Sequence, residues 1–563
     1  MKPSLESQIE ELRQEMESQR GQIDDLKQQL TERDVQLQQA QQAAQQAQQA
    51  AQAAQQAANE EQQTLSANTQ AVSSLRSSVS DLKSSSSSAT AIISSVQKQQ
   101  TEIRHAVENP DAIHFRGVTI SPTGSFIAAE TVWQQGATGG GINTPFTGVP
   151  LANSDNAQMS AFQGTGRQSR LALKATGKLA STTLSGYYEM DWLGTGITSN
   201  NNQSNSYVLR QRQLWADALF SSGWDVSGGQ GWSLASETTQ GLTRGTEILP
   251  ATIDPQYEAG FVWTRQYSFR VSKDLGNTFW IGASAENAET LNPAGSNLPT
   301  NLIIGSGGAG GGLFNPTANY SFNYSPDFIA KIAWQPGWGH WELFGIERNF
   351  RARVYPNAKS STGAYNDTIP GAGIGGGFRV PFASKKVSVG LKGLWGKGMG
   401  RYGSSTIADV TLRPDGELDP LKAFSALSTL ELFPTRRLMI YLNYGGDYVY
   451  RDYWGKIGYG SPMTTMTGCN TQPFPGTSAV NGGNGFSPSS PADCGNQNKD
   501  VQEFTAGDWY YFYNGPRGGL RFGLQYSRFE RDLWSGAGGT TNPGGGANGI
   551  DNMFWTSFRY YLP

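Results

Sequence analysis

Several residue types are scarce in this 563-residue chain, and each shortage excludes a class of protein. Three histidines and two cysteines are too few and too scattered for a metal centre, and we expect no cofactor. No run of 18 apolar residues occurs, so the sequence predicts no transmembrane helix. Only 16% of the residues are charged and the net charge is −3, which excludes the strongly basic surface of a protein that binds nucleic acid.

The N-terminal part lacks two residue types that are abundant afterwards. Residues 1–113 contain no Phe, Trp or Tyr, and Gly21 is the only one of 69 glycines found there. They hold 9 of the 43 basic and 15 of the 46 acidic residues, so the remainder is near neutral. Asn109-Pro110 stands at this change of composition, and proline biases the preceding residue away from helix. We therefore predict two domains, residues 1–109 and 113–563.

The segment from Met1 to Arg20 is polar and charged, without the apolar core that marks a secretory signal peptide. Taken alone, this segment would indicate a cytoplasmic protein. The second domain has the character of an envelope protein, so we expect that a signal was removed or lies upstream.

A seven-residue apolar repeat dominates the first domain. Alternate steps of four and three residues from Leu5 to Val107 reach 30 positions, of which 24 are apolar. An unbroken repeat predicts a left-handed coiled coil, and at about 1.5 Å per residue the rod would be roughly 150 Å long. Between Ala40 and Ala58 every core position is alanine, which buries little area and predicts a thin, weakly stabilised section.

The core residues of this coil bear on its oligomeric state. Mixed Ile, Leu and Val at both core positions does not strongly favour a dimer. The segment Leu65-Ser66-Ala67-Asn68-Thr69 resembles the Asn-Thr core motif of trimeric autotransporter stalks, in which the asparagine binds an anion on the threefold axis. That resemblance implies a homotrimer with Asn68 in its core. The alternative is that Asn68 is a polar core residue that merely fixes the register.

After residue 113 the apolar period changes from 3.5 to 2. Large apolar residues alternate with polar or small ones in the segments 328–334, 386–395, 520–527 and 554–562, which predicts strands with one apolar and one polar face. Abundant aromatics near strand ends, a mean hydropathy of −0.47 and long glycine-rich connections favour a membrane barrel, with lipid outside and water inside. At roughly 25–30 residues per strand and connection, we predict an all-β transmembrane barrel of about 16–18 antiparallel strands.

Three features resemble Gram-negative outer-membrane porins: the opening segment His114–Ile120, the repeated strand-and-loop pattern, and the terminal strand Phe554–Pro563. A coiled coil followed by a barrel is similar to the phosphate-selective porin O/P family and to coiled-coil-tethered porins. The resemblance implies the outer membrane of a diderm bacterium, contact with its lipid, and a periplasmic coil that could touch peptidoglycan. The chain departs from these barrels at its last residue, which is Pro563 instead of the usual Phe.

Charged residues at alternate positions are candidates for the wall of a pore. Arginine binds oxyanions through a planar fork, so arginine pairs suit an anion pathway, and facing acids would create a transverse field across a constriction. The alternative is that these residues are solvated wall charges, and the near balance of charges implies no strong anion selectivity. The pore-lining candidates are Arg170, Lys174, Glu189, Asp191, Arg210, Arg212, Arg351, Arg353 and Arg521.

Signals for catalysis and nucleotide binding are weak. His340 is the one histidine well inside the second domain, and its segment Gly337–Trp341 is more typical of a turn with interface aromatics than of a general base. The segment Gly305–Gly310 matches a dinucleotide-binding pattern, but Asn315-Pro316 follows it instead of a helix. We therefore expect no enzymatic activity.

The two cysteines, Cys469 and Cys494, lie in a turn-rich stretch that ends near Asn498. In an oxidising compartment we expect a disulfide that pins a long loop, and two free thiols are the alternative. No further cysteine in the sequence competes for either partner.

Two functions from different classes fit these features. The first is a homotrimeric outer-membrane porin for passive diffusion of small hydrophilic solutes or ions, with the coil as a periplasmic spacer or cell-wall tether. The second is a structural envelope tether or adhesin-like surface trimer without a channel. Trimeric autotransporters supply only a short C-terminal anchor per chain, whereas residues 113–563 are all strand and loop here. We therefore favour the porin.

Overall fold

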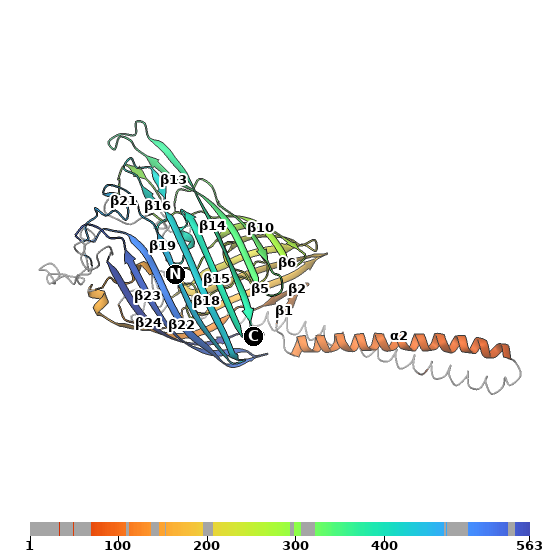
Figure 1. Ribbon diagram of the computed structural model, residues 1–563. Coiled ribbons are helices and arrows are strands. Elements are labelled where there is room, and N and C mark those ends of the chain that lie inside the picture. Colours follow the sequence, from red (N-terminus) through yellow and green to blue (C-terminus); the bar gives the residue numbers. More distant parts are fainter. Residues whose placement is uncertain are drawn as a thin grey trace, which may run out of the picture. The chain divides into compact units, whose positions relative to one another are not determined.

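A computed structural model describes residues 69–108, 112–136, 146–152, 154–194, 207–292, 298–305, 321–466, 494–538 and 547–563, together with residues 33, 49 and 469. The chain forms two compact units, residues 1–110 and 111–563, and each is considered by itself (Figure 1). None of the described helices has the length and apolarity needed to cross a membrane.

The first unit contains the long helix α2 (Thr69–Glu108). Its side chains from residue 79 to residue 100 are exposed, including Val79, Leu82, Ile93 and Val96 of the seven-residue repeat. An apolar stripe of this kind is stable in water when another helix covers it. The helix is thus confirmed, whereas the coiled coil and the trimer stay predictions, and Asn68 lies outside the described residues.

The second unit is a closed antiparallel barrel with 16 strand positions in its wall, at the lower limit of the predicted range. β24 (Asn548–Tyr561) returns to pair with β3 (Phe126–Gln134) and closes the ring. The other wall strands are β5 (Arg170–Leu179), β6 (Thr182–Gly194), β7 (Val208–Leu219), β8 (Trp224–Trp232), β9 (Arg265–Leu275), β10 (Phe279–Glu286), β12 (Asp327–Trp334), β13 (His340–Val354), β14 (Tyr365–Phe382), β15 (Val387–Lys397), β18 (Lys422–Thr435), β19 (Leu438–Val449), β22 (Asn498–Gly515) and β23 (Gly518–Leu533).

Short elements complete the wall and its connections. β1 (Ile113–Phe115) forms a hairpin with β2 (Val118–Ser121), which pairs with β5. β4 (Ala161–Thr165) pairs with β3, and β11 (Leu302–Ile303) pairs with β13. The connections contain the hairpins β16 (Val410–Leu412) to β17 (Leu418–Pro420) and β20 (Asp452–Trp454) to β21 (Ile457–Tyr459), and the 3-10 helices η1 (Phe146–Gly148), η2 (Asp155–Gln158) and η3 (Gly400–Tyr402).

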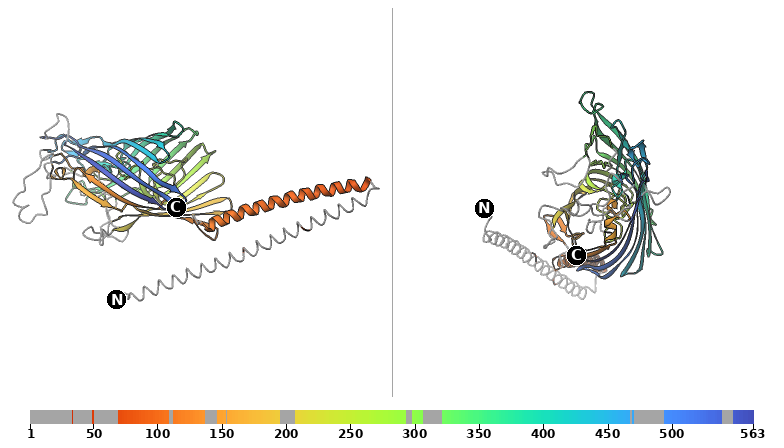
Figure 2. Two further views of the ribbon diagram at one scale, coloured as in Figure 1. Left: turned by 90° about the horizontal axis from the view of Figure 1, so that it is seen from below. Right: turned by 90° about the vertical axis from the view of Figure 1, so that its left-hand side faces the viewer.

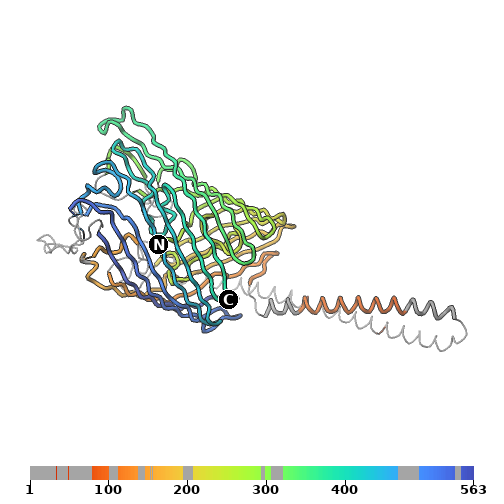
Figure 3. The backbone as a smooth tube through the Cα atoms, in the orientation of Figure 1, coloured from red at the N-terminus to blue at the C-terminus, as the bar shows by residue number. Residues whose placement is uncertain are grey.

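Short and long connections alternate along the chain, so they gather at opposite ends of the barrel (Figure 3). The end with short connections, such as 180–181, 436–437 and 516–517, is called the turn end. The end with long connections, such as 233–264 and 398–421, is called the loop end. The last residues of β24 pair with the first residues of β23, so the C-terminus lies at the turn end.

The polarity of the barrel is the reverse of that of a soluble one. Exposed outward residues from nearly every wall strand are large and apolar, whereas the buried inward residues include many charged ones. This arrangement is that of a transmembrane barrel, and it confirms the predicted inversion. Outward examples are Ile127, Leu171, Leu214, Phe269, Ile281, Phe328, Leu343, Ile374, Leu391, Phe424, Phe504, Leu524 and Phe554, and inward ones are Glu130, Asp191, Arg212, Lys331, Arg348, Glu503 and Arg559.

Aromatic side chains gather at the turn between β12 and β13. The Trp338 ring lies 5.8 Å from that of Trp334 and 5.4 Å from that of Trp341. His340 between them is buried, and its Nε2 lies 3.0 Å from Oε1 of Glu342. The aromatic cluster at the turn end is what a membrane interface favours, because indole rings prefer the headgroup region.

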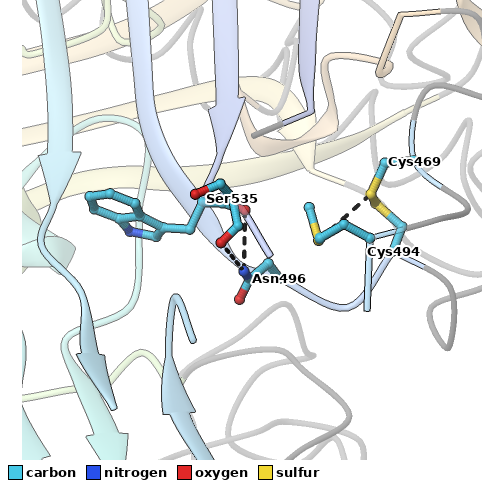
Figure 4. The surroundings of a disulfide bond; sticks show 6 residues. Cys469, Cys494, Asn496 and Ser535 are labelled. Atoms are coloured by element: carbon cyan, nitrogen blue, oxygen red, sulfur yellow. Dashed lines mark hydrogen bonds between the residues drawn. A yellow bond between two sulfur atoms is a disulfide. The ribbon is translucent and has the colours of Figure 1, made fainter. Parts of the chain in front are cut away.

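A disulfide joins Cys469 and Cys494 in the connection between β19 and β22, with their Cα atoms 4.9 Å apart (Figure 4). Close to it, Asn496 donates hydrogen bonds of 2.9 and 3.0 Å to the carbonyl oxygens of Ser461 and Ser535. Cys469 belongs to an apolar cluster with Met466 of the same connection and with residues of three other segments, Leu151, Leu533 and Ala547. The disulfide therefore lies inside a packed layer at the loop end.

The connection between β8 and β9, residues 233–264, folds into the barrel, and we call it the inward loop. The view in the right panel of Figure 2 shows segments inside the ring of strands. Leu234, Leu242 and Val262 belong to an apolar cluster with wall residues such as Trp280 and Phe344. Ile253 and Ala259 belong to a second one with Tyr441, Trp509 and Trp555. The inward loop thus packs against two sides of the wall.

Polar wall residues hold the backbone of the inward loop. An unpaired buried N–H group costs roughly 1–3 kcal/mol, and carboxylate acceptors form stronger hydrogen bonds than neutral ones. Each of five loop N–H groups donates to a side chain of a different wall strand, at 2.6 to 3.1 Å: Leu234 to Glu286, Thr238 to Glu342, Ile253 to Gln525, Ala259 to Glu503 and Gly260 to Asp447. These bonds fix the loop across the lumen.

Gly260 marks the closest approach of the inward loop to the wall. Its φ is +79°, and a Cβ atom added there would collide with the carbonyl oxygen of Ala426. Only glycine allows both this conformation and this contact.

We expect Gly260→Ala to lift the inward loop from β18 and β19, because the added methyl group cannot coexist with the Ala426 carbonyl. The variant should lose about 1–3 kcal/mol of stability and show a larger, noisier channel conductance. Thermal unfolding and bilayer recordings measure these effects. Gly276→Ala is the control, since Gly276 has a φ of +80° with nothing within 4 Å. Equal effects of both changes would show that backbone strain, and not the contact, matters.

Candidate functional site: a charged constriction

A β-bulge arranges the charges on the wall beside the inward loop. The register of β6 and β7 shifts between Glu189 and Met190, so that Arg212 is an extra residue on β7. A bulge places two successive residues on the same face. Both Arg212 and Gln213 are therefore buried, and both donate hydrogen bonds to Glu189, at 2.5 and 3.3 Å.

Three further ion pairs lie along this wall of the lumen. Arg212 also contacts Asp191 at 2.7 Å, and Arg210 contacts the same carboxylate at 2.9 Å. On the other side of β3, Arg559 pairs with Glu130 at 2.6 Å. The two partners of each ion pair neutralise each other, so the pairs hold the wall side chains in place without adding net charge.

Arg170 on β5 differs from these arginines. Its guanidinium lies 5.1 Å from the centre of the Phe126 ring, and its buried Nε has no hydrogen-bond partner among the described residues. Arg521 on β23 is similar, because its Nε is also unpaired and its guanidinium lies 4.0 and 4.4 Å from the Trp509 and Tyr561 rings. Each of these two arginines therefore has one buried N–H group without a partner among the described residues, while the terminal nitrogens of Arg521 donate to the hydroxyl groups of Tyr511 and Tyr561.

These two arginines line a cavity of about 580 Å³ between the wall and the inward loop. Three carboxylates line it as well, but each is paired with an arginine outside the lining: Glu189 with Arg212, Glu247 with Arg270 at 3.6 Å, and Glu431 with Arg379 at 3.0 Å. Arg170, Lys174 and Arg521 have no ion pair among the described residues. The cavity therefore carries a net positive charge.

A much narrower space adjoins this cavity at Arg170 and Pro255, with a volume of about 10 Å³. That volume is on the scale of a single water molecule. Its wall side is formed by Arg170, Asp191 and Arg212, and its loop side by residues 254–257. We call it the constriction.

Asp254 is the acidic residue on the loop side of the constriction. It is buried, and its Oδ1 accepts a 2.9 Å hydrogen bond from Nε2 of Gln525. Burial raises the pKa of Asp254 to about 7. Its charge opposite Arg170 and Arg212 therefore changes near neutral pH.

The structure brings seven of the nine predicted pore residues together on the lumen wall: Arg170, Lys174, Glu189, Asp191, Arg210, Arg212 and Arg521. Arg351 and Arg353 are placed otherwise, and their prediction as pore residues is wrong. On β13 the even-numbered residues are buried inside, and the odd-numbered ones share the outward face with Leu343. Alternation in the sequence gives the period of a strand but not the face that meets the lumen.

Arg559 and Glu130 are wall residues that sequence reasoning missed. Arg559 lies between Phe558 and Tyr560 in the last strand, so its polar position in an alternating segment was a usable signal. Asp254 gave no such signal, because it lies in an irregular loop. Among the described residues, no cluster of His, Cys, Asp or Glu could hold a metal ion.

Comparison with known proteins gives matches to structures only. No family model and no curated protein matches the sequence. The outer membrane channel DcaP of Acinetobacter baumannii has a TM-score of 0.52 at 15% identity, over 80% of this chain and 99% of that chain. The barrel has the porin fold. The anion-selective porin from Comamonas acidovorans gives a TM-score of 0.41 at 12% identity, over 79% and 99% of the two chains, which is too low to support an argument.

A sequence identity of 15% establishes the porin architecture and nothing about the solute. The solute has to be inferred from the chemistry of the constriction. The narrower resemblance to the phosphate-selective porin O/P family stays a prediction. The inward loop, the bulged arginine wall and the cavity between them form the candidate site.

The raised pKa of Asp254 predicts a pH-dependent selectivity. Below about pH 7 the carboxyl group is protonated, so the constriction is more positive and its preference for anions is greater; above that pH the preference falls. Reversal potentials under a salt gradient at several pH values measure this change. Asp254→Asn should remove the step, whereas Asp415→Asn, an exposed acid at the loop end, should keep it. A step that survives in Asp254→Asn would assign the titration to another group.

Proposed function

We propose that the chain is an outer-membrane porin that allows passive diffusion of small hydrophilic solutes and prefers anions. The observation that carries the proposal is the cavity with uncompensated Arg170, Lys174 and Arg521, joined to the constriction at Arg170. A polar lumen inside an apolar outer surface suits passive diffusion. Guanidinium groups without an ion pair attract anions more strongly in a partly enclosed cavity than in open water.

The aromatic neighbours of Arg521 support this proposal. The Arg521 guanidinium lies beside the Trp509 and Tyr561 rings and is held in one orientation by the hydrogen bonds that it donates to the hydroxyl groups of Tyr511 and Tyr561. The neighbouring acids are each neutralised by an arginine that does not line the cavity. An anion in the cavity therefore meets three cations, Arg170, Lys174 and Arg521, that form no ion pair within 4 Å among the described residues.

Channel recordings in planar bilayers test the function directly. The wild-type protein should conduct, with a reversal potential of the sign expected for anions. Arg170→Gln and Arg521→Gln should each lower the anion-to-cation permeability ratio, by roughly twofold or more, because each removes a cation from a region of low dielectric. Arg353→Gln is the matched control, since this arginine lies on the outward face. Silence of a well-folded sample would instead favour a structural envelope protein without a channel.

The second part of the proposal concerns α2. We propose that it forms a trimeric coiled coil on the periplasmic side, as a spacer or tether towards peptidoglycan. The chain enters the barrel through β1 and β2, and β2 pairs with the turn-end half of β5. In even-stranded outer-membrane barrels, short turns and both chain ends lie in the periplasm. The exposed stripe on α2 supports association, because apolar stripes of this period are covered in coiled coils.

Two substitutions separate a coiled coil from a solvated helix. The double variant Ile93→Ser/Val96→Ser should lower the melting temperature of the helical signal by several degrees, because it removes two apolar core residues. Ile92→Ser is the control, since Ile92 is exposed but lies outside the repeat. Circular dichroism and cross-linking of the full chain measure both properties. Equal melting of all three proteins would contradict a coiled coil at these positions.

A further inference from the structure

The outward face of the barrel carries a groove over β15, β18 and β19. Its volume is about 480 Å³, and residues from these strands and from β22 line it. Small residues form the floor, where Ala426 and Gly446 line the groove as register partners, and Gly393 is the partner of Ala426 on β15. The groove thus runs across the strands.

Large side chains form both sides of this groove. On the loop side, Phe424 is the register partner of Trp395 and Tyr448, and on the turn side Ser428 is the partner of Leu391 and Tyr444. The exposed fractions of Leu391, Phe424 and Tyr444 are 46%, 43% and 56%. The sides are therefore apolar and open outward, on the surface that faces lipid in a membrane barrel.

Two lysines lie just beyond the loop side of the groove, two residues along their strands from Trp395 and Phe424. Lys397 and Lys422 are direct register partners on β15 and β18, and both are exposed on the outward face. The ammonium group of Lys422 lies 5.9 Å from the Trp395 ring and 5.6 Å from the Tyr450 ring. Like charges opposite each other destabilise a strand pair, so an anion between the lysines would stabilise it.

The acidic groups nearby do not neutralise the two lysines. Neither lysine has an ion pair within 4 Å among the described residues. Asp452 interacts with Lys397 only at longer range. Asp500, which lines the loop side of the groove, is already paired with Lys499 at 3.0 Å.

We propose that this outward groove binds the acyl chain of an anionic membrane lipid, whose phosphate group lies between Lys397 and Lys422. The proposal rests on the membrane location in the proposed function and adds a partner to it. The floor of small residues accepts a hydrocarbon chain, and the lysine pair supplies the positive charge for the phosphate. A second copy of the chain is a poorer occupant, because its facing surface would need an acidic group to match the two lysines.

Native mass spectrometry of the delipidated full-length protein tests the site, with dimyristoyl phosphatidylglycerol and dimyristoyl phosphatidylcholine as probes. The wild-type protein should retain the anionic lipid in preference to the zwitterionic one. Lys397→Gln and Lys422→Gln should each weaken phosphatidylglycerol binding about fivefold, as expected for one basic residue near a phosphate. Lys273→Gln is the matched control, because Lys273 also lies on a tryptophan ring, Trp224, but near the turn end.

A second variant tests the groove without changing its charge. Ala426→Phe fills the floor and should weaken binding of both lipids while the lysines stay in place. Equal retention of the two lipids by the wild type, or an unchanged affinity in the lysine variants, would overturn the proposal. A loss of oligomer in Ala426→Phe would also overturn it, because the groove would then be covered by another copy. Conductance of the same samples reports on the porin function separately, so failure of lipid selection in a conducting protein refutes only the lipid site.

Discussion

Closure of the hydrogen-bonded ring is the constraint on which the rest of the structure depends. Lipid offers no partner to a backbone N–H or C=O group, so a sheet that spans a membrane must have no free edge. The pairing of β24 with β3 removes that edge. Once the ring is closed, alternate side chains have to meet lipid, and the remaining ones enclose a space that is too wide for their own side chains to fill.

The inward loop occupies part of that space under the same rule. Its irregular backbone is tolerated inside the barrel because wall side chains such as Glu503 and Asp447 accept its N–H groups. The side chains that hold the loop come from β10, β13, β19, β22 and β23, so the loop is anchored around much of the wall. Residues 254–257 of the anchored loop face Arg170 and Arg212 across the constriction, so the anchoring of the loop also fixes the electrostatics of the passage.

Charged side chains have different surroundings on the inward and outward faces of the wall. Inside, many cations are paired, whereas Arg170, Lys174 and Arg521, which have no ion pair among the described residues, line a cavity. Outside, Lys397 and Lys422 lie at the loop end, where a membrane presents its phosphate groups. The position of a cation relative to lipid and lumen, and not its presence in the chain, determines what it can bind.

Local periodicity was readable from the sequence: the helix at Thr69–Glu108, the strands with their two faces, the number of strands within the predicted range, and the boundary near Pro110. These depend on neighbours along the chain. The tertiary structure alone decided which face meets the lumen, which is why Arg351 and Arg353 were misplaced while Arg170 was not. It also decided that residues 233–264 turn inward, and that a bulge puts Arg212 and Gln213 on one face. These features depend on contacts between residues far apart in the chain, and a single sequence contains no period that reports them.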